Sequence, residues 1–194
     1  MNPILLDLDS IIDFSSVQGI QEYRSLTFSL SLVSKYYPVS QLVKEVLKGS
    51  LTEAKPYPDS LTLEELGYRS RILVVTNLPK MEGKRLLMRY NLDAFVQDLV
   101  SPEDVNRFFP SKEFLDFSAR KLNSVRGIMT LITPHVDQAI VARAQGLRVI
   151  LLRSKVSLPQ DLGIGIRDDL TQVAESLAQH RVDSTMGDSS LRCT

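Results

Sequence analysis

The stretch Ile4-Leu5-Leu6-Asp7-Leu8-Asp9-Ser10, near the start of the chain, carries its strongest structural signal. The stretch begins with an aliphatic run, which is typical of a parallel strand buried on both faces. Asp7 and Asp9 follow at positions i and i+2, and strand periodicity places both on the same side of the chain. Two carboxylates this close repel each other unless a cation, a proton or solvent relieves them. The pair is therefore either a candidate metal site or two solvated acids at a strand end.

Four more short aliphatic runs follow, and each is bounded by polar or turn residues. They span residues 72–75, 95–100, 127–133 and 149–152. Helical patterns alternate with these runs, at residues 79–90, 111–122, 137–145 and from Asp168 or Asp169 to about residue 180. This alternation predicts an α/β domain with a doubly wound, mostly parallel five-stranded sheet and right-handed crossovers.

One stretch interrupts the alternation and predicts a second structural unit. Residues 14–55 read as helices without a strand, with Ser40 as an expected helix N-cap. We interpret this insertion as a reduced helical cap over the carboxyl ends of the strands, where ligands of open α/β sheets bind. Residues 1–13 and 56–181 then form the core. The polar residues 182–194 are predicted to be a disordered tail, and Gly163-Ile164-Gly165 is predicted to be a turn.

Composition narrows the function classes. Of 194 residues, 43% are hydrophobic, and 23 Lys plus Arg balance 23 Asp plus Glu. A neutral chain with mixed charges lacks the basic excess of a nucleic-acid-binding protein. Cys193 is the only cysteine, which excludes an intrachain disulfide and suits a reducing compartment. No apolar run approaches the length of a membrane span. We expect a cytoplasmic protein with neither a nucleic-acid nor a membrane partner.

A second polar group follows the strand at residues 72–75. Thr76 and Asn77 come directly after it, and in a parallel sheet they reach the same edge as Asp7. A hydroxyl group and nearby backbone N–H groups at such an edge can hold a phosphate oxygen. The two strand ends together therefore form a candidate site for a phosphate oxygen.

Four segments in order, at residues 4–10, 72–77, 100–115 and 131–147, resemble the haloacid dehalogenase-like (HAD-like) hydrolase superfamily. The resemblance covers about residues 3–180 and is nearest to the branch of phosphoglycolate phosphatases and β-phosphoglucomutases. It implies a Rossmannoid core in which Asp7 is the nucleophile that forms an aspartyl phosphate. It further implies that Asp9 is the general acid and base. Thr76, Asn77 and Ser10 would bind phosphate.

The resemblance also implies a Mg²⁺ ion held by Asp7, Asp9 and an acid of the fourth motif, for which Asp137 is the candidate. The sequence departs from the family pattern at several positions where this chemistry needs charge or polarity. Ile11 replaces a threonine of the first motif, and Phe109 replaces the lysine of the third. The fourth-motif positions for Gly, Asp and a second Asp hold Thr133, Pro134 and Gln138.

Two residues could compensate for these losses. Lys112 lies one helical turn beyond Phe109, and His135 lies in the loop after the fourth motif's strand. Each also has a simpler interpretation, as an exposed helix residue and as a polar loop residue. Without them, nothing positive is expected opposite Asp7 and Asp9, and losing one such electrostatic partner typically lowers a rate by about 10²- to 10³-fold.

The sequence therefore predicts a catalytically degenerate HAD-like protein that binds a small ligand or a protein partner. The alternative is an active Mg²⁺-dependent phosphatase or phosphotransferase that acts on a small phosphate ester through an aspartyl phosphate on Asp7. A third reading is haloacid-type chemistry at carbon on the same aspartate, which requires a cationic or amide cradle for its substrate.

Overall fold

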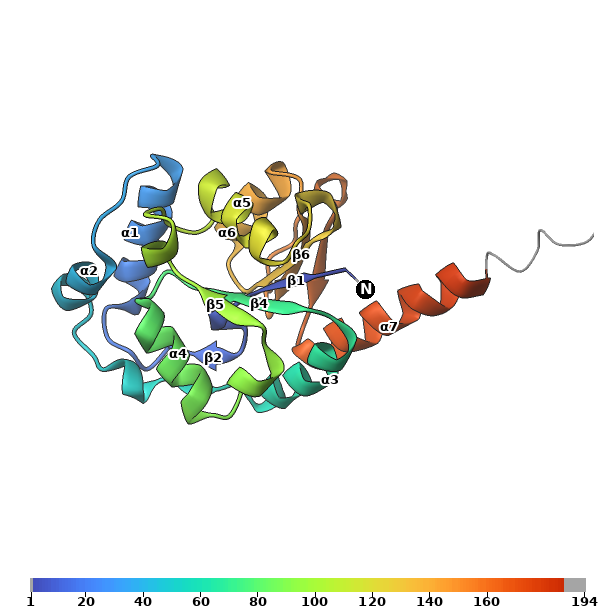
Figure 1. Cartoon of the computed structure of the whole chain (residues 1–194), viewed down its shortest axis with the longest axis horizontal. Helices are drawn as coiled ribbons and strands as arrows, with labels where there is room; N and C mark the ends of the chain where they lie inside the picture. Colours follow the sequence, from blue (N-terminus) through green and yellow to red (C-terminus); the bar gives the residue numbers. More distant parts are fainter. Residues whose placement is uncertain (1, 187–194) are drawn as a thin grey trace, which may run out of the picture.

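The computed structural model describes residues 2–186, and side chains as far as residue 178. A six-stranded sheet with the order β5-β4-β1-β6-β7-β8 lies at its centre (Figure 1). Its strands are β1 (Ile4–Asp7), β4 (Ile72–Val75), β5 (Asp98–Val100), β6 (Thr130–Thr133), β7 (Arg148–Leu152) and β8 (Ile164–Arg167). All neighbouring strands pair in parallel, so their carboxyl ends meet at one edge. The predicted parallel α/β fold is confirmed.

Helices cover both faces of the sheet, because the strand side chains alternate between two apolar clusters. Leu6 belongs to the cluster that is covered by α3 (Thr62–Arg69), α4 (Lys80–Arg89) and α7 (Leu170–Met186). Leu5, its neighbour, belongs to the cluster that is covered by α5 (Lys112–Lys121) and α6 (Val136–Ala144). The arrangement is doubly wound, as expected, and it places β1 at the centre with helices on both sides (Figure 1).

The sixth strand, β8, was missed by the sequence pattern, and the predicted turn at Gly163-Ile164-Gly165 is wrong. Gly163 has a φ of 62° and ends a short 3₁₀ turn, and the strand begins at the next residue. The strand lies at an edge of the sheet and is only half-buried along its length. An edge strand that contains Gly165 and Arg167 lacks the aliphatic run by which the other strands are recognised.

The insertion after β1 is bracketed by a small antiparallel ribbon of β2 (Ile12–Asp13) and β3 (Lys55–Pro56). Between the two strands lie α1 (Ile20–Leu32) and α2 (Val39–Val46), at the left end of the molecule in Figure 1. The expected N-cap at Ser40 is wrong, because Pro38 occupies the cap position and Ser40 lies inside α2. Proline suits a helix start, since its missing N–H has no partner to lose there.

The last helix is longer than the sequence suggested. Asp169 caps it by accepting a hydrogen bond from the N–H of Gln172, and α7 then runs to Met186. Residues 182–186 are thus helical rather than part of a disordered tail, because no glycine or proline interrupts the sequence from Leu170 to Met186. Residues 187–194 lie outside the described residues. Over residues 2–186, none of the helices combines the length and the apolar character needed to cross a bilayer.

Candidate active site

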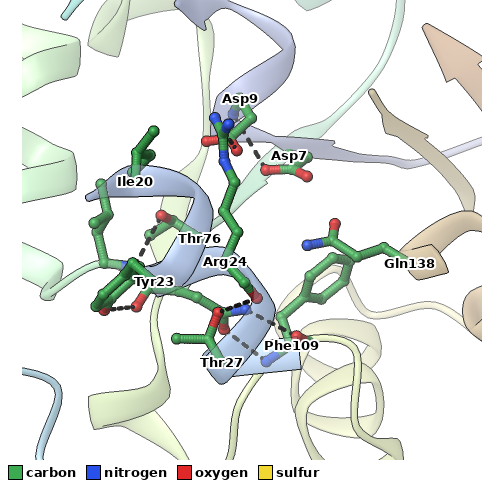
Figure 2. A pocket seen from close by; sticks show the side chains of 11 residues that line it. Asp7, Asp9, Ile20, Tyr23, Arg24, Thr27, Thr76, Phe109 and Gln138 are labelled. Carbon is green, nitrogen blue, oxygen red and sulfur yellow. Dashed lines mark hydrogen bonds and ion pairs between the residues drawn. The ribbon is translucent and has the colours of Figure 1, made fainter. Parts of the chain in front are cut away.

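A small cavity lies where the carboxyl ends of the central strands meet helix α1 (Figure 2). Its volume is about 30 Å³, which is room for about two water molecules. The sheet side contributes Asp7, Asp9, Thr76, Asn77, Leu78, Phe109 and Gln138, and α1 contributes Ile20, Tyr23, Arg24 and Thr27. We call the first group the floor and the second the roof. The roof residues follow the spacing i, i+3, i+4 and i+7, which defines one helix face.

Asp7 ends β1, the strand that lies between β4 and β6, and only 5% of it is exposed. Its Oδ1 accepts the N–H of Asp9 at 3.1 Å, and its Oδ2 accepts the hydroxyl of Thr133 at 2.8 Å. Burial, followed by the negative charge of Asp9, raises the pKa of Asp7 to about 6. The side chain is therefore mostly ionised at neutral pH and can act as a nucleophile.

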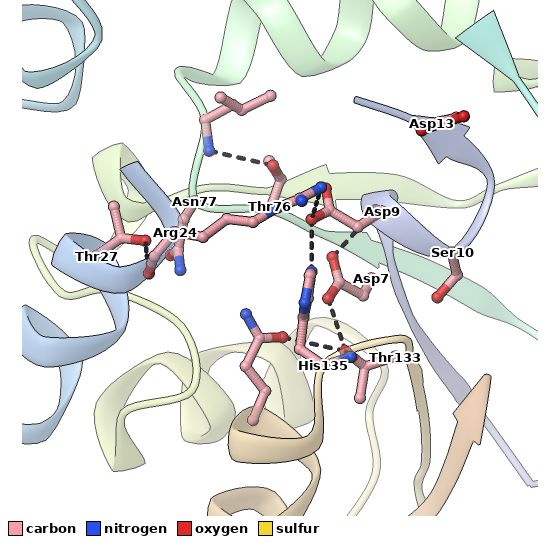
Figure 3. Close-up of polar contacts among 12 residues, drawn as sticks. Asp7, Asp9, Ser10, Asp13, Arg24, Thr27, Thr76, Asn77, Thr133 and His135 are labelled. Atoms are coloured by element: carbon pink, nitrogen blue, oxygen red, sulfur yellow. Dashed lines mark hydrogen bonds and ion pairs between the residues drawn. The ribbon is translucent and has the colours of Figure 1, made fainter. Parts of the chain in front are cut away.

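Asp9 lies two residues further on, in a 3₁₀ turn that spans Leu8–Ser10, and it is held by Arg24 and His135 (Figure 3). Its Oδ2 is 2.7 Å from Nη2 of Arg24 and 2.6 Å from Nε2 of His135. Burial alone would raise the pKa of Asp9, but Arg24 and His135 outweigh it, so the pKa is lowered. Burial likewise opposes the charge on His135, but the hydrogen bond to Asp9 wins and raises the pKa of that imidazole.

The expectation that nothing positive faces the acidic pair is therefore wrong. His135, one of the two candidate compensating residues, reaches Asp9 from the N-cap position of α6. Arg24 arrives from α1 and was missed by sequence reasoning. The signal that could have revealed Arg24 is its place on the helix face of Ile20, Tyr23 and Thr27. Nothing in that pattern separates a cavity residue from a residue that packs inside the insertion itself.

Thr76 and Asn77 stand after β4, next to Asp7, as the sequence predicted for that edge. The Thr76 hydroxyl oxygen accepts the N–H of Leu78 at 3.1 Å, which leaves its hydrogen free for a ligand. The Asn77 amide instead bonds the backbone of Phe109 in both directions, at 2.8 and 2.9 Å. Ser10 does not line the cavity, because its hydroxyl donates to the carbonyl of Ile132.

The position of the third-motif lysine is filled by an apolar side chain. Phe109 is 1% exposed, lines the cavity, and packs edge-on against Phe114 with ring centroids 5.5 Å apart. Lys112 is exposed at the first position of α5 and is not among the lining residues. Within the part of the chain that the structure describes, no lysine lines the cavity.

The fourth-motif positions provide amide and hydroxyl groups rather than acids. Gln138 is 9% exposed and lies beside the Thr133 hydroxyl, which is 3.1 Å from its Oε1. Asp137 is exposed, and its carboxylate accepts the N–H of the adjacent Gln138. Of the eight site residues predicted from the sequence, Asp7, Asp9, Thr76, Asn77 and His135 gather at the cavity, whereas Ser10, Lys112 and Asp137 do not.

The residues present do not fit the Mg²⁺ ion that the resemblance implies. Across residues 2–186, no group of three or more His, Cys, Asp or Glu side chains is placed to hold a metal. Both oxygens of Asp7 already accept hydrogen bonds, and Asp9 is paired with Arg24. At ~5 Å and an effective dielectric of ~20, a divalent ion and one positive charge repel each other by about 7 kcal/mol.

No protein-family model and no curated protein matches this sequence. Solved structures, in contrast, match most of the chain. A dehalogenase structure superposes with a TM-score of 0.77 at 14% identity, covering 89% of this chain and 95% of that chain. A structure of L-2-haloacid dehalogenase from Xanthobacter autotrophicus, with chloropropionic acid covalently bound, has a TM-score of 0.70 at 12% identity and covers 84% and 80%.

A third structure shows a HAD-hydrolase from Bacillus subtilis bound to magnesium. It superposes with a TM-score of 0.67 at 15% identity and covers 91% of this chain and 98% of that chain. These similarities show that the chain has a HAD-like fold, and they confirm the fold that the four sequence segments implied. Sequence identities this low support a shared fold only, and a shared fold does not determine the chemistry of the site.

Proposed function

We propose that this HAD-like protein binds a small anionic ligand between α1 and the edge of the sheet, and that it does not perform fast magnesium-dependent phosphoryl transfer. The observation that carries the proposal is that Arg24 and His135 are bonded to Asp9. Asp9 is the residue to which the family resemblance assigns proton transfer. A general acid works best with a pKa near the operating pH. Arg24 and His135 lower the pKa of Asp9 instead, and they occupy its Oδ2.

Three polar groups at the cavity suit an anion. Arg24 supplies positive charge, the Thr76 hydroxyl has a hydrogen to donate, and the Gln138 amide lies on the floor. A small phosphorylated molecule is the ligand we favour, and a protein partner and a cytoplasmic location stay predictions.

The test combines binding with activity. We expect inorganic phosphate to raise the melting temperature of the wild-type protein through linkage and to have less effect on Thr76→Val. Thr171→Val, which removes an exposed hydroxyl on α7, is the matched control and should behave as wild type. Hydrolysis of p-nitrophenyl phosphate with Mg²⁺ should stay at background. Magnesium-dependent hydrolysis that disappears in Asp7→Asn would instead establish the active phosphatase.

A second function, substitution at carbon, is favoured by one observation. Arg24 and Gln138 line the cavity together with Asp7, which supplies the cationic and amide cradle that such chemistry needs, without a metal. The Asp7 carboxylate would displace chloride from a 2-chloroacid, and water would then hydrolyse the ester to a hydroxy acid. Incubation with 2-chloropropionate and measurement of chloride release tests this. Release that is absent in Asp7→Asn would support it, and no release from the wild type would exclude it for this substrate.

A further inference from the structure

Arg24 is fixed against Asp9 by more than one contact. Its guanidinium lies 2.7 Å from Asp9 Oδ2 and 6.0 Å from the ring centroid of Phe14, within range of a cation–π interaction. The two paired side chains are 22% and 15% exposed, so solvent screens them only in part. The position of the Arg24 guanidinium in the site is therefore fixed by contacts with two different residues.

The neighbouring residue on α1 fastens the same helix to the core. The Tyr23 hydroxyl donates to the carbonyl of Asn77 at 2.6 Å, in the loop that follows β4. Tyr23 is 2% exposed, so this hydrogen bond is shielded from water. With Tyr23 bonded to one loop and Arg24 to another, the roof has two polar attachments to the floor (Figure 2).

The cluster already holds a positive charge without a metal. Asp7 and Asp9 bring two negative charges, and Arg24 brings one permanent positive charge 2.7 Å from Asp9. A divalent ion added to this set would leave an excess of positive charge. The same ion added to the two carboxylates alone would neutralise them, which is the usual role of a metal with oxygen ligands.

We infer that Arg24 is a built-in counter-ion, carried on α1, which takes the place of a divalent cation and excludes Mg²⁺ and Mn²⁺ from the Asp7–Asp9 pair while α1 is docked on the sheet edge. The inference rests on the proposed function only in using the same cavity. It differs from that function in needing no ligand. It also means that the cation of this site is covalently part of α1, so it does not exchange with ions in solution.

The experiment measures Mn²⁺ binding by electron paramagnetic resonance, in which the signal of free hydrated Mn²⁺ falls as the ion binds. We expect the wild-type protein to leave the signal of equimolar Mn²⁺ almost unchanged. Arg24→Gln, which removes the charge and leaves a shorter polar side chain, should bind Mn²⁺ at least about tenfold more tightly. Arg24→Lys keeps the charge and should continue to exclude the ion.

Four further variants test whether the effect is specific to this site. Arg85→Gln removes an exposed guanidinium on α4 and should match the wild type. Adding Asp7→Asn to Arg24→Gln should abolish the gain, and adding Gln138→Asp should increase it by supplying a third carboxylate. Circular dichroism melting verifies that each variant is folded, and His135→Gln, which removes the other cationic group, gives a second route to a gain if Arg24→Gln does not fold.

Two results would overturn the inference. One is wild-type Mn²⁺ binding as tight as that of Arg24→Gln and lost in Asp7→Asn. The other is a folded Arg24→Gln protein whose affinity for Mn²⁺ equals that of the wild type. Neither measurement involves phosphate, so a failure of the phosphate-binding test leaves this inference intact, and a failure here leaves the phosphate-binding proposal to its own test.

Discussion

The floor and the roof of the cavity are built in different ways. The floor residues Asp7 and Thr76 lie at the ends of strands that are buried on both faces. Their hydrogen-bond donors lie at the end of β6 and in the turns that follow β1 and β4. The roof lies on α1, a helix whose outer face is exposed and which reaches the core through Tyr23 and Arg24. The comparison teaches that the sheet fixes where a nucleophile can stand, whereas the inserted helix determines the charge that it meets.

The largest expected difference between the two regions is in stability. Leu6 is fully buried in β1, and Leu6→Ala should lower the free energy of unfolding by about 2–5 kcal/mol, because it removes transfer energy and leaves a cavity. Leu26 on α1 is 39% exposed, and Leu26→Ala should change that free energy by less than about 0.5 kcal/mol. Urea denaturation measures both. Equal losses would contradict the distinction between the buried sheet and the more exposed helix α1.

The next effect is the pH dependence of the free energy of unfolding, to which the floor residue Asp7 contributes. Its pKa is about 6 in the folded protein, against an ordinary value of 3.8, so the folded state binds the proton more tightly. The stability that this protonation contributes is fully present below pH ~4 and is lost as the pH rises through about 6. A shift of about two units corresponds to about 3 kcal/mol. Urea denaturation between pH ~4 and ~8 should show this loss in wild type and a smaller one in Asp7→Asn.

His135 and Asp9 also make the free energy of unfolding depend on pH. The raised pKa of His135 adds a loss of stability in the same sense, as the pH rises above its ordinary value. The lowered pKa of Asp9 contributes stability above the ordinary value of 3.8, and that stability is lost only as the pH falls below it. Identical pH profiles for the wild type and Asp7→Asn would show that Asp7 is not the source of the dependence.

A smaller effect should come from the attachment of the roof. Tyr23→Phe removes the donor to the Asn77 carbonyl and should lower the free energy of unfolding by about 1 kcal/mol. It should also weaken the exclusion of Mn²⁺, because α1 is held less firmly over Asp9. Tyr37→Phe is the matched control, since that hydroxyl is bonded to Glu45 at the surface, and no measurable loss is expected. If both variants behave alike, the Tyr23 hydrogen bond does not hold the roof in place.

The smallest effect is predicted for Lys112, which the sequence offered as a replacement for the missing lysine. Lys112→Ala removes an exposed positive charge at the start of α5, where the helix dipole disfavours it. Stability should change by less than about 0.5 kcal/mol, and the shift in melting temperature caused by phosphate should be unchanged. A lost shift would show that Lys112 reaches the ligand after all.

Much of the fold could be predicted because the strands are buried on both faces. The aliphatic run at residues 72–75 coincides with β4, and the first run coincides with β1 to within one residue. Errors occur where apolar residues do not continue a strand. Val96 and Ile128 belong to predicted strands, but β5 and β6 begin only at Asp98 and Thr130, each after a 3₁₀ turn.

The site was predictable only where it depends on strand ends. Asp7, Thr76 and His135 all come to one edge because β1, β4 and β6 are parallel neighbours there. Arg24 could not be predicted, because helical periodicity shows that a residue faces inward but not what it faces. Ser10 was misjudged for a related reason, since the chain turns after Asp9 and directs that hydroxyl towards the carbonyl of Ile132.

The bond between Asn77 and Phe109 has a consequence for how the site could change through mutation. The Asn77 amide bonds both the N–H and the carbonyl of Phe109, and the Phe109 ring packs against Phe114. The position of the third-motif lysine is therefore already filled. Phe109→Lys would replace a ring that is 1% exposed by an ammonium group, and burial of a charge is costly unless the charge is paired and hydrogen-bonded. A lysine at position 109 would therefore need further substitutions around it that make room for the ammonium group and pair it.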